Sequence, residues 1–391
     1  MRTKLLFAVL LAGCGSEYTP TSPPLDVPDA AVIVVPDAPD VGVDFDEDGL
    51  SDEAEAALGT SPTDPDSDDD GILDGTERAT GPEFDYVAAG CDPLHRDVLF
   101  EIDYQIMGDQ SSRLSPAVEA HLTSFYAGLD IANPDGTTGI HAVFRYDDDD
   151  VLPPEFRCYY DEASGSVEGD HSESSFPTTT FRKITLCLNP PGVGGYHGNS
   201  PIASRLAKMR GPAPDADPTN DETELRQWTW YFLFLHETGH MLGLLHGGDQ
   251  NLNQKVNYPS LMNERYNSRF DGSPNTLAET RIQYSPGRLP PLDGCGHLDE
   301  AGSFPGLEPE DVDFIAHADA MDPFAVSGTA VDWNRDGDFG DTGVTATLSA
   351  TSACEVRDHD DLAAIAATMR CGLPGNCAAK RGEIEVRERF F

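Results

Sequence analysis

Basic residues are scarce in this 391-residue chain, which has 25 Lys and Arg against 69 Asp and Glu. The formal net charge is therefore -44 at pH 7. A field of this sign repels the phosphates of nucleic acids, so the composition excludes nucleic acid as a partner. The same surplus of carboxylates favours solubility and the binding of cations.

Long apolar runs are also lacking. The one pronounced run, residues 5–12, follows Arg2 and Lys4 and is too short for a transmembrane helix, so we expect residues 1–13 to be a signal peptide that is removed. The run ends in Leu-Ala-Gly-Cys, which resembles a bacterial lipobox and implies a lipid-modified Cys14. We therefore expect an exported bacterial lipoprotein, at the outer membrane or cell surface, attached to the membrane through its lipid anchor only.

Residues 14–43 are rich in Pro, Ser, Thr, Asp and Val and lack a helical or strand period, which predicts an extended tether behind the lipidated Cys14. The chain has 8 cysteines, and without Cys14 an exported protein can form up to three disulfides and leave one thiol. Their pairing stays open, although Cys371 and Cys377 are close enough for a local loop.

An acidic pattern begins at Asp44 and is repeated from Asp66. Each copy places carboxylates at alternate positions around a glycine, as a hard cation such as Ca²⁺ requires. The expected calcium ligands are Asp44, Asp46, Asp48, Asp52 and Glu55 in the first loop and Asp66, Asp68, Asp70, Asp74 and Glu77 in the second. The pattern resembles the calcium-binding repeats of thrombospondin type 3. We therefore expect residues 44–80 to bind two or more structural calcium ions and to act as a stiff spacer.

From residue 97 the composition is that of a globular domain. Residues 98–104, 139–146 and 184–188 have strand character, and residues 115–129 have the pattern of a helix. This alternation predicts an α+β domain with one twisted sheet over residues 88–320. Residues 321–391 are expected to form a C-terminal extension. It contains a candidate third calcium loop with Asp332, Asn334 and Asp336, in which Gly343 occupies the last ligand position.

Only 11 histidines occur in the chain, yet three of them lie in the stretch HETGHMLGLLH. His236 and His240 are four residues apart on a long predicted helix, so both side chains project from one face and can bind one metal ion. Glu237 lies beside them, where a carboxylate can act as general base on a water activated by zinc. Gly243 lets the chain leave the helix sharply, so that His246 can return as a third ligand. Three protein ligands leave one position open, as in catalytic zinc sites.

This stretch resembles the motif of the metzincin metallopeptidases, and residues 257–263, NYPSLMN, resemble the Met-containing turn of that clan. The wider segment also resembles predicted bacterial zinc-dependent proteases. The likeness covers roughly residues 95–320 and implies a metzincin-like fold with one twisted sheet, a long active-site helix and a Met-turn. It implies one catalytic zinc ion on His236, His240 and His246, with Met262 as an apolar floor, and a protein or peptide as substrate.

Two positions depart from the best-known subfamilies of that clan. Gly247 directly follows the third histidine, and Glu264 stands where astacin-like and serralysin-like relatives have a zinc-contacting Tyr. Tyr258 and Tyr266 are the alternatives for that role.

The sequence thus predicts a zinc-dependent endopeptidase that acts outside the cytoplasm. Two other functions stay open: a calcium-stiffened surface binding or adhesion protein with an inactive zinc site, and a zinc hydrolase with a non-protein substrate. The presence of Glu237 together with all three histidines speaks against the first, and the Met-turn speaks against the second.

Overall fold

The protein is described from a computed structural model. It divides into two compact units, residues 1–40 and 41–391. The described residues are 42–81, 83–108, 110–146, 151–154, 159–161, 166–168, 180–188, 194–197, 206–210, 222–250, 252–265, 283–302, 325–327, 330–349 and 353–370. The expected signal peptide, Cys14, the tether to residue 41, Tyr266, Cys371 and Cys377 lie outside them. Within the described ranges, no helix combines the length and apolarity that crossing a membrane needs.

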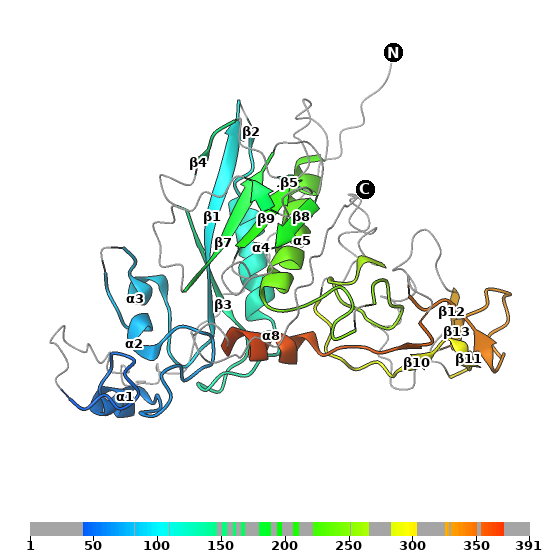
Figure 1. Ribbon diagram of the computed structural model, residues 1–391, viewed down its shortest axis with the longest axis horizontal. Helices are drawn as coiled ribbons and strands as arrows, with labels where there is room; N and C mark the ends of the chain where they lie inside the picture. Colours follow the sequence, from blue (N-terminus) through cyan, green and yellow to red (C-terminus); the bar gives the residue numbers. More distant parts are fainter. Residues whose placement is uncertain are drawn as a thin grey trace, which may run out of the picture. The chain divides into compact units, whose positions relative to one another are not determined.

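A seven-stranded mixed sheet lies at the centre of the second unit (Figure 1). Strand β1 pairs in parallel with β3, β4 and β7, and β7 pairs in parallel with β9, whereas β2 and β8 are antiparallel to their neighbours. The strands are β1 (Asp97–Met107), β2 (Gln110–Ser111), β3 (His141–Arg145), β4 (Val151–Leu152), β7 (Phe181–Cys187), β8 (Gly194–His197) and β9 (Leu206–Arg210). A mixed sheet with few helices is compatible with the expected α+β class.

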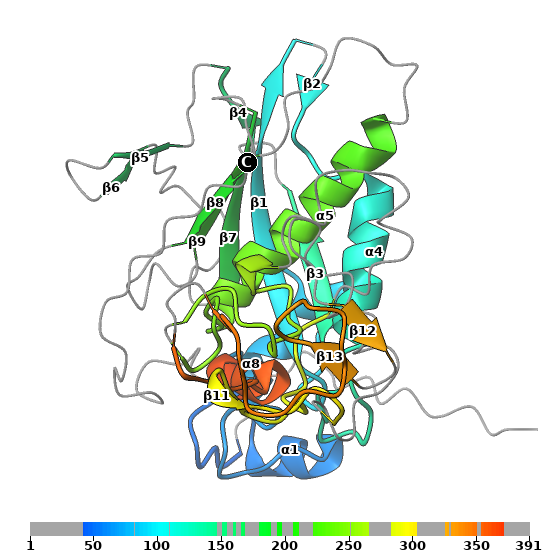
Figure 2. The same ribbon diagram turned by 90° about the vertical axis from the view of Figure 1, so that its right-hand side faces the viewer.

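Helices α4 (Pro116–Ala127) and α5 (Glu222–Met241) lie along one face of this sheet (Figure 2). Helix α4 begins where the Ser115 hydroxyl accepts a hydrogen bond from the Val118 amide. Alternate residues of β1 point toward the helices because successive strand side chains face opposite sides. Phe100 is one of them, and its ring lies 5.1 Å from that of Phe234 and 5.9 Å from that of Tyr126.

The opposite face of the sheet is covered by the segment that follows the second acidic loop. Three short helices occur in this part of the chain: α1 (Asp52–Leu58) at the end of the first acidic loop, α2 (Asp74–Glu77) at the end of the second and α3 (Tyr86–Ala89) after it. A second buried cluster joins this segment to the sheet and consists of Ile72, Phe84, Tyr86, Cys91, Leu99, Val143 and Phe181. The second acidic repeat is therefore packed on the sheet, whereas the sequence suggested that residues 44–80 act as a spacer. The physical reason is that Ile72 of the second loop and the apolar side chains of residues 84–91 pack against the sheet.

The C-terminal part contains three short two-stranded ladders around a separate cluster that includes Trp333, Leu348 and Val356. They are β10 (Leu292–Asp293) with β15 (Glu355–Val356), β11 (Cys295–Leu298) with β14 (Val344–Thr345), and β12 (Ala325–Ser327) with β13 (Ala330–Asp332). A further ladder joins β5 (Tyr159–Asp161) and β6 (Ser166–Glu168).

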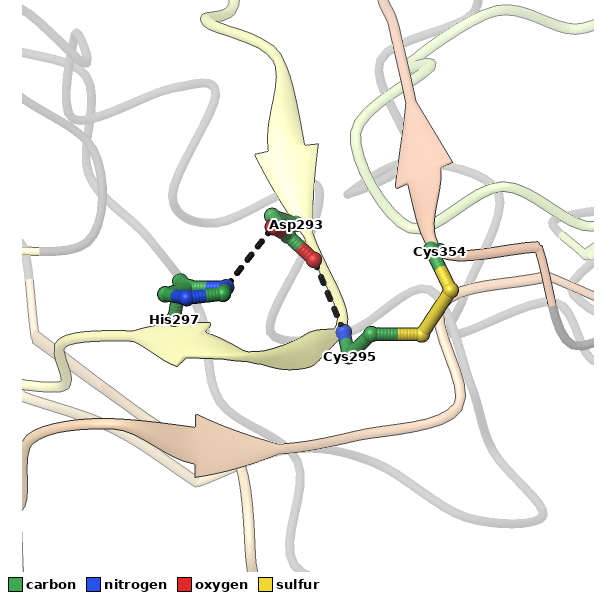
Figure 3. Close-up of a disulfide and its surroundings, with 4 residues drawn as sticks. All are labelled: Asp293, Cys295, His297 and Cys354. Carbon is green, nitrogen blue, oxygen red and sulfur yellow. Dashed lines mark hydrogen bonds and ion pairs between the residues drawn. A yellow bond between two sulfur atoms is a disulfide. The ribbon is translucent and has the colours of Figure 1, made fainter.

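A disulfide joins Cys295, the first residue of β11, to Cys354, the residue directly before β15 (Figure 3). Beside it, the Asp293 carboxylate accepts a hydrogen bond from the Cys295 amide at 2.9 Å and lies 2.8 Å from Nδ1 of His297. Cys187 is also disulfide-bonded, and Cys91 is a buried free thiol.

Helix α8 (Asp361–Met369) belongs to the main core, because its residues Ile365 and Met369 lie in the same buried cluster as Phe234 and Leu242. The core thus continues beyond residue 320, where the sequence suggested that an extension begins.

The first residue of α8, Asp361, is fully buried and holds several polar groups in place. Its carboxylate accepts hydrogen bonds from the Tyr258 hydroxyl at 2.7 Å, the Ser260 hydroxyl at 2.6 Å and the Ser285 amide at 2.9 Å. Nδ1 of His359 lies 2.9 Å from the same carboxylate, and this contact raises the pKa of His359. Asp361 therefore fixes α8 against residues 258–260.

We predict that Asp361→Asn lowers the free energy of unfolding by about 2–4 kcal/mol, since an amide group would turn a donor toward groups that are themselves donors. Denaturant unfolding followed by fluorescence measures it. Asp360→Asn is the matched control: Asp360 caps the same helix through the Ala363 amide, and Asn caps as well as Asp, so its effect should stay within about 0.5 kcal/mol. Equal effects of the two substitutions would contradict the role given to Asp361.

Candidate metal centre

Helix α5 places His236, Glu237 and His240 inside the protein. The turns before them, residues 230–235, are buried on all sides. Such a helix is held by packing between the sheet and α4, which fixes the direction of each side chain. All three functional side chains are buried.

The chain leaves α5 through a glycine, as the sequence predicts. Gly243 has a φ of 92°, in the left-handed region that favours glycine. The Gly243 amide donates to the His240 carbonyl, and the Leu244 amide donates to the Gly239 carbonyl, both at 2.9 Å. These two bonds form a Schellman ending, which reverses the chain and returns His246 toward the helix. A side chain at Gly243 would also overlap Thr368 of α8.

The three imidazoles converge through their Nε2 atoms. Nε2 of His246 lies 3.4 Å from Nε2 of His236 and 3.1 Å from Nε2 of His240. Two nitrogens bound to one zinc ion at tetrahedral angles stand about 3.3 Å apart, given Zn–N bonds of roughly 2.0–2.1 Å. The arrangement therefore has the dimensions of a three-histidine metal site.

The outer nitrogens of these rings fix the tautomer. Nδ1 of His236 lies 2.8 Å from the Leu261 carbonyl, and Nδ1 of His240 lies 2.8 Å from the Leu244 carbonyl. A carbonyl oxygen can only accept, so both Nδ1 atoms carry the proton and both Nε2 lone pairs point inward. This is how metal-binding histidines are commonly oriented in proteins.

The third histidine is oriented by Glu264, whose Oε1 lies 3.5 Å from Nδ1 of His246. The other carboxylate oxygen of Glu264 accepts a hydrogen bond from the side-chain amide of Asn253. Glu264, where the sequence resemblance led us to look for a tyrosine, contacts a histidine of the triad in this structure. Tyr258, one alternative for a zinc-contacting tyrosine, directs its hydroxyl to Asp361.

The turn at residues 258–263 lies directly below the helix. A Cβ atom added to Gly239 would overlap the sulfur of Met262, so the sulfur packs against the backbone of α5 between the two helical histidines. The turn closes through a hydrogen bond from the Asn263 amide to the Ser260 carbonyl at 3.0 Å. Because Leu261 of this turn accepts the Nδ1 proton of His236, the turn and the histidines form one unit.

The acidic loops all have the same local conformation. Their fourth residues, Glu47, Asp69 and Arg335, have φ of 64°, 64° and 65°. In each loop the carboxylate at position one accepts a hydrogen bond from the glycine at position six, with lengths of 3.2, 3.0 and 2.9 Å from the first loop to the third. The loop at Asp332 therefore has the geometry of the first two, although Gly343 stands at its last position.

Groups of carboxylates gather in the first two loops. One group consists of Asp44, Asp46 and Asp48, a second of Asp66, Asp68 and Asp70, and a third of Asp70, Glu77 and Asp97; in each, the ligand atoms lie within 4.8 Å of one another. Glu55 is fully buried as well. Asp52 and Asp74 belong to none of these three groups; Asp52 accepts a hydrogen bond from the Phe45 amide at 3.1 Å, and Asp74 accepts one from the Ser67 amide at 2.8 Å.

Burial and mutual repulsion make these carboxylates hard to ionise. Burial raises the pKa of Asp66 and of Asp74 to about 6, and burial with the nearby Asp46 and Asp48 charges raises that of Glu55 to about 7. Burial and the Asp70 charge raise the pKa of Asp68 to about 11. A bound cation would remove this penalty, because it attracts the charges that otherwise repel one another.

Several residues of these sites were not predicted from the sequence. Asp97 begins β1 and belongs to no repeat, and the only available signal was an acidic residue directly before an apolar strand. Asp361 binds the Ser260 hydroxyl of the Met262 turn across a separation of 101 residues in the sequence. Glu300 is fully buried and accepts hydrogen bonds from the amides of Trp333 and Asn334, so it faces the loop at Asp332 from another segment.

In comparisons with known proteins, no protein-family model, no curated protein and no solved structure matches the chain.

Proposed function

We propose that the protein is a zinc-dependent endopeptidase of the metzincin type that hydrolyses peptide bonds outside the cytoplasm. The observation that carries the proposal is the convergence of three Nε2 atoms from His236, His240 and His246, with Glu237 on the same helix between two of them. The left-handed exit at Gly243 and the Met262 turn support it, because each holds a part of this triad in place.

The donor set fits zinc. Neutral imidazoles with inward Nε2 lone pairs suit a borderline-soft ion such as Zn²⁺, and three of them leave one position open. Zinc bound there would supply a Lewis acid that polarises the scissile carbonyl and lowers the pKa of a water molecule.

The side chains of this protein have separate tasks in such a reaction. Glu237 accepts a proton from the attacking water and passes it to the leaving amine, and its burial keeps solvent from competing for that proton. The carbonyls of Leu261 and Leu244 keep the histidine rings from rotating. Met262 fills the space under the helix without a polar group.

The remaining features belong to the same proposal. Structural calcium ions occupy the acidic loops, and a lipid on Cys14 holds the enzyme at the outer membrane or cell surface, so that it meets protein or peptide substrates outside the cell's cytoplasm. The finer fold is then a metzincin-like domain preceded by calcium-binding repeats.

The decisive experiment measures metal content and cleavage of an unfolded protein substrate by the purified chain. A phenanthroline chelator, used in buffer that retains calcium, separates the effect of zinc from that of calcium. We expect about one zinc per chain and proteolysis that stops with the chelator and returns with added zinc. Zinc binding without cleavage of any protein substrate would favour a binding protein or a hydrolase for another substrate.

Glu237→Ala is predicted to keep about one zinc per chain and to lower kcat at least about 100-fold, since it removes the proton shuttle but no metal ligand. Glu237→Gln, which preserves the buried volume, should behave in the same way. Zinc content and cleavage rate are measured on the same preparations. Activity equal to that of the parent in either variant would overturn the role of Glu237.

Met262→Leu is predicted to retain zinc and to destabilise the protein by less than about 1.5 kcal/mol, because the side chain packs and does not bind metal. Met369→Leu changes another fully buried methionine of the same cluster, away from Gly239, and serves as the control. Complete loss of zinc from a folded Met262→Leu protein, with zinc retained in the control, would assign more than packing to Met262.

A further inference from the structure

The second acidic loop lies against the beginning of β1. The amide of Asp97, the first residue of that strand, donates a hydrogen bond of 2.6 Å to Oδ2 of Asp70. Five carboxylates meet here, each no more than 2% exposed: Asp66, Asp68, Asp70, Glu77 and Asp97. Four come from the acidic repeat and one from the central sheet.

The oxygens of this group are placed as ligands would be. Atoms of Asp70, Glu77 and Asp97 lie within 4.8 Å of one another, as do atoms of Asp66, Asp68 and Asp70. Both carboxylate oxygens of Glu77 are buried and find no hydrogen-bond donor among the described residues. Carboxylates without donors are costly to bury, so this one points to a ligand that it is built to bind.

Of the neighbouring basic groups, His141 contacts one of the five carboxylates, and Arg96 and Arg370 are directed to other partners. Arg96 donates from Nη1 to the Asn133 side chain at 3.2 Å and to the Ala132 carbonyl. His141 contacts Oδ1 of Asp97 through Nδ1, and Arg370 binds Asp69 on the outer side of the loop at 2.9 Å. His141 offsets the charge of Asp97 at most, so most of the charge of the five carboxylates is left for a cation to offset.

We infer that the second acidic loop and the central sheet share one divalent cation of the calcium class, and that Asp97 supplies its ligand from the sheet. Oxygen-only donors, several of them carboxylates, are typical of Ca²⁺ and too numerous for a hydrated Mg²⁺. The ion would fasten the repeat to β1 rather than only order the repeat.

The neighbouring apolar contacts show what depends on this ion. Ile72, within the second loop, packs with Leu99 of β1 and Phe181 of β7 on the face of the sheet away from α5. If the ion leaves, repulsion between Asp97 and the loop acts at the edge of this cluster. Calcium should therefore stabilise the sheet as well as the repeat, whether or not the protein is a peptidase.

The test uses the full chain and compares calcium binding by calorimetry with thermal unfolding in calcium and in chelator. We expect Asp97→Asn and Glu77→Gln to weaken one calcium site at least about 10-fold and to reduce the calcium-dependent rise in Tm. Magnesium at the same concentration should give a smaller rise. Circular dichroism in calcium-free buffer establishes that each variant is folded before binding is compared.

His141→Gln is the matched control, because it removes the basic side chain that contacts the Asp97 carboxylate and leaves the carboxylate in place. It should bind as many calcium ions as the parent, with similar affinity. Parent-like calcium binding by both Asp97→Asn and Glu77→Gln would overturn the inference. So would a loss in His141→Gln as large as that in Asp97→Asn, since Asp97 would then act through the histidine.

Discussion

The left-handed exit from α5 at Gly243 is the constraint on which the triad depends. A helix alone can present two histidines on one face, and the third must come from a chain that has turned back at once. Gly243 makes this turn, and the absence of a side chain there leaves room for Thr368 of α8. The same glycine thus sets the position of His246 and admits the C-terminal helix to the core.

Beyond that contact, buried polar groups connect α8 to the histidines. Helix α8 brings Asp361 under the turn that contains Met262, and this turn returns the Leu261 carbonyl to His236. Both of these connections, from Asp361 to Ser260 and from Leu261 to His236, are polar contacts. Each is a directional hydrogen bond in a dry environment, where a lost partner costs more than the bond contributes.

Local spacing explains which features could be predicted from the sequence. The three histidines and Gly243 lie within a dozen residues of one another, and so do the alternate carboxylates of each acidic loop. Helix and loop geometry alone therefore relate the members of each set. The predicted helix at residues 115–129 and the strand at 98–104 correspond to α4 and β1 for the same reason. Asp97, Asp361 and Glu300 act across the fold, and no period in the sequence connects them to their partners. The position of the repeat on the sheet was missed because its apolar residues, such as Phe84 and Tyr86, follow the acidic pattern instead of belonging to it.

Strand β1 has one further consequence, which comes from its alternating side chains. Leu99 belongs to the cluster beneath the acidic repeat, and Phe100, the next residue, belongs to the cluster around α5. One peptide unit therefore separates the two buried clusters. A shift of β1 along its axis would change the packing of both clusters together. If ions bind on both sides of β1, as we propose, this strand connects the two sites. Any gain in affinity that one ion confers on the other must be returned by the same factor.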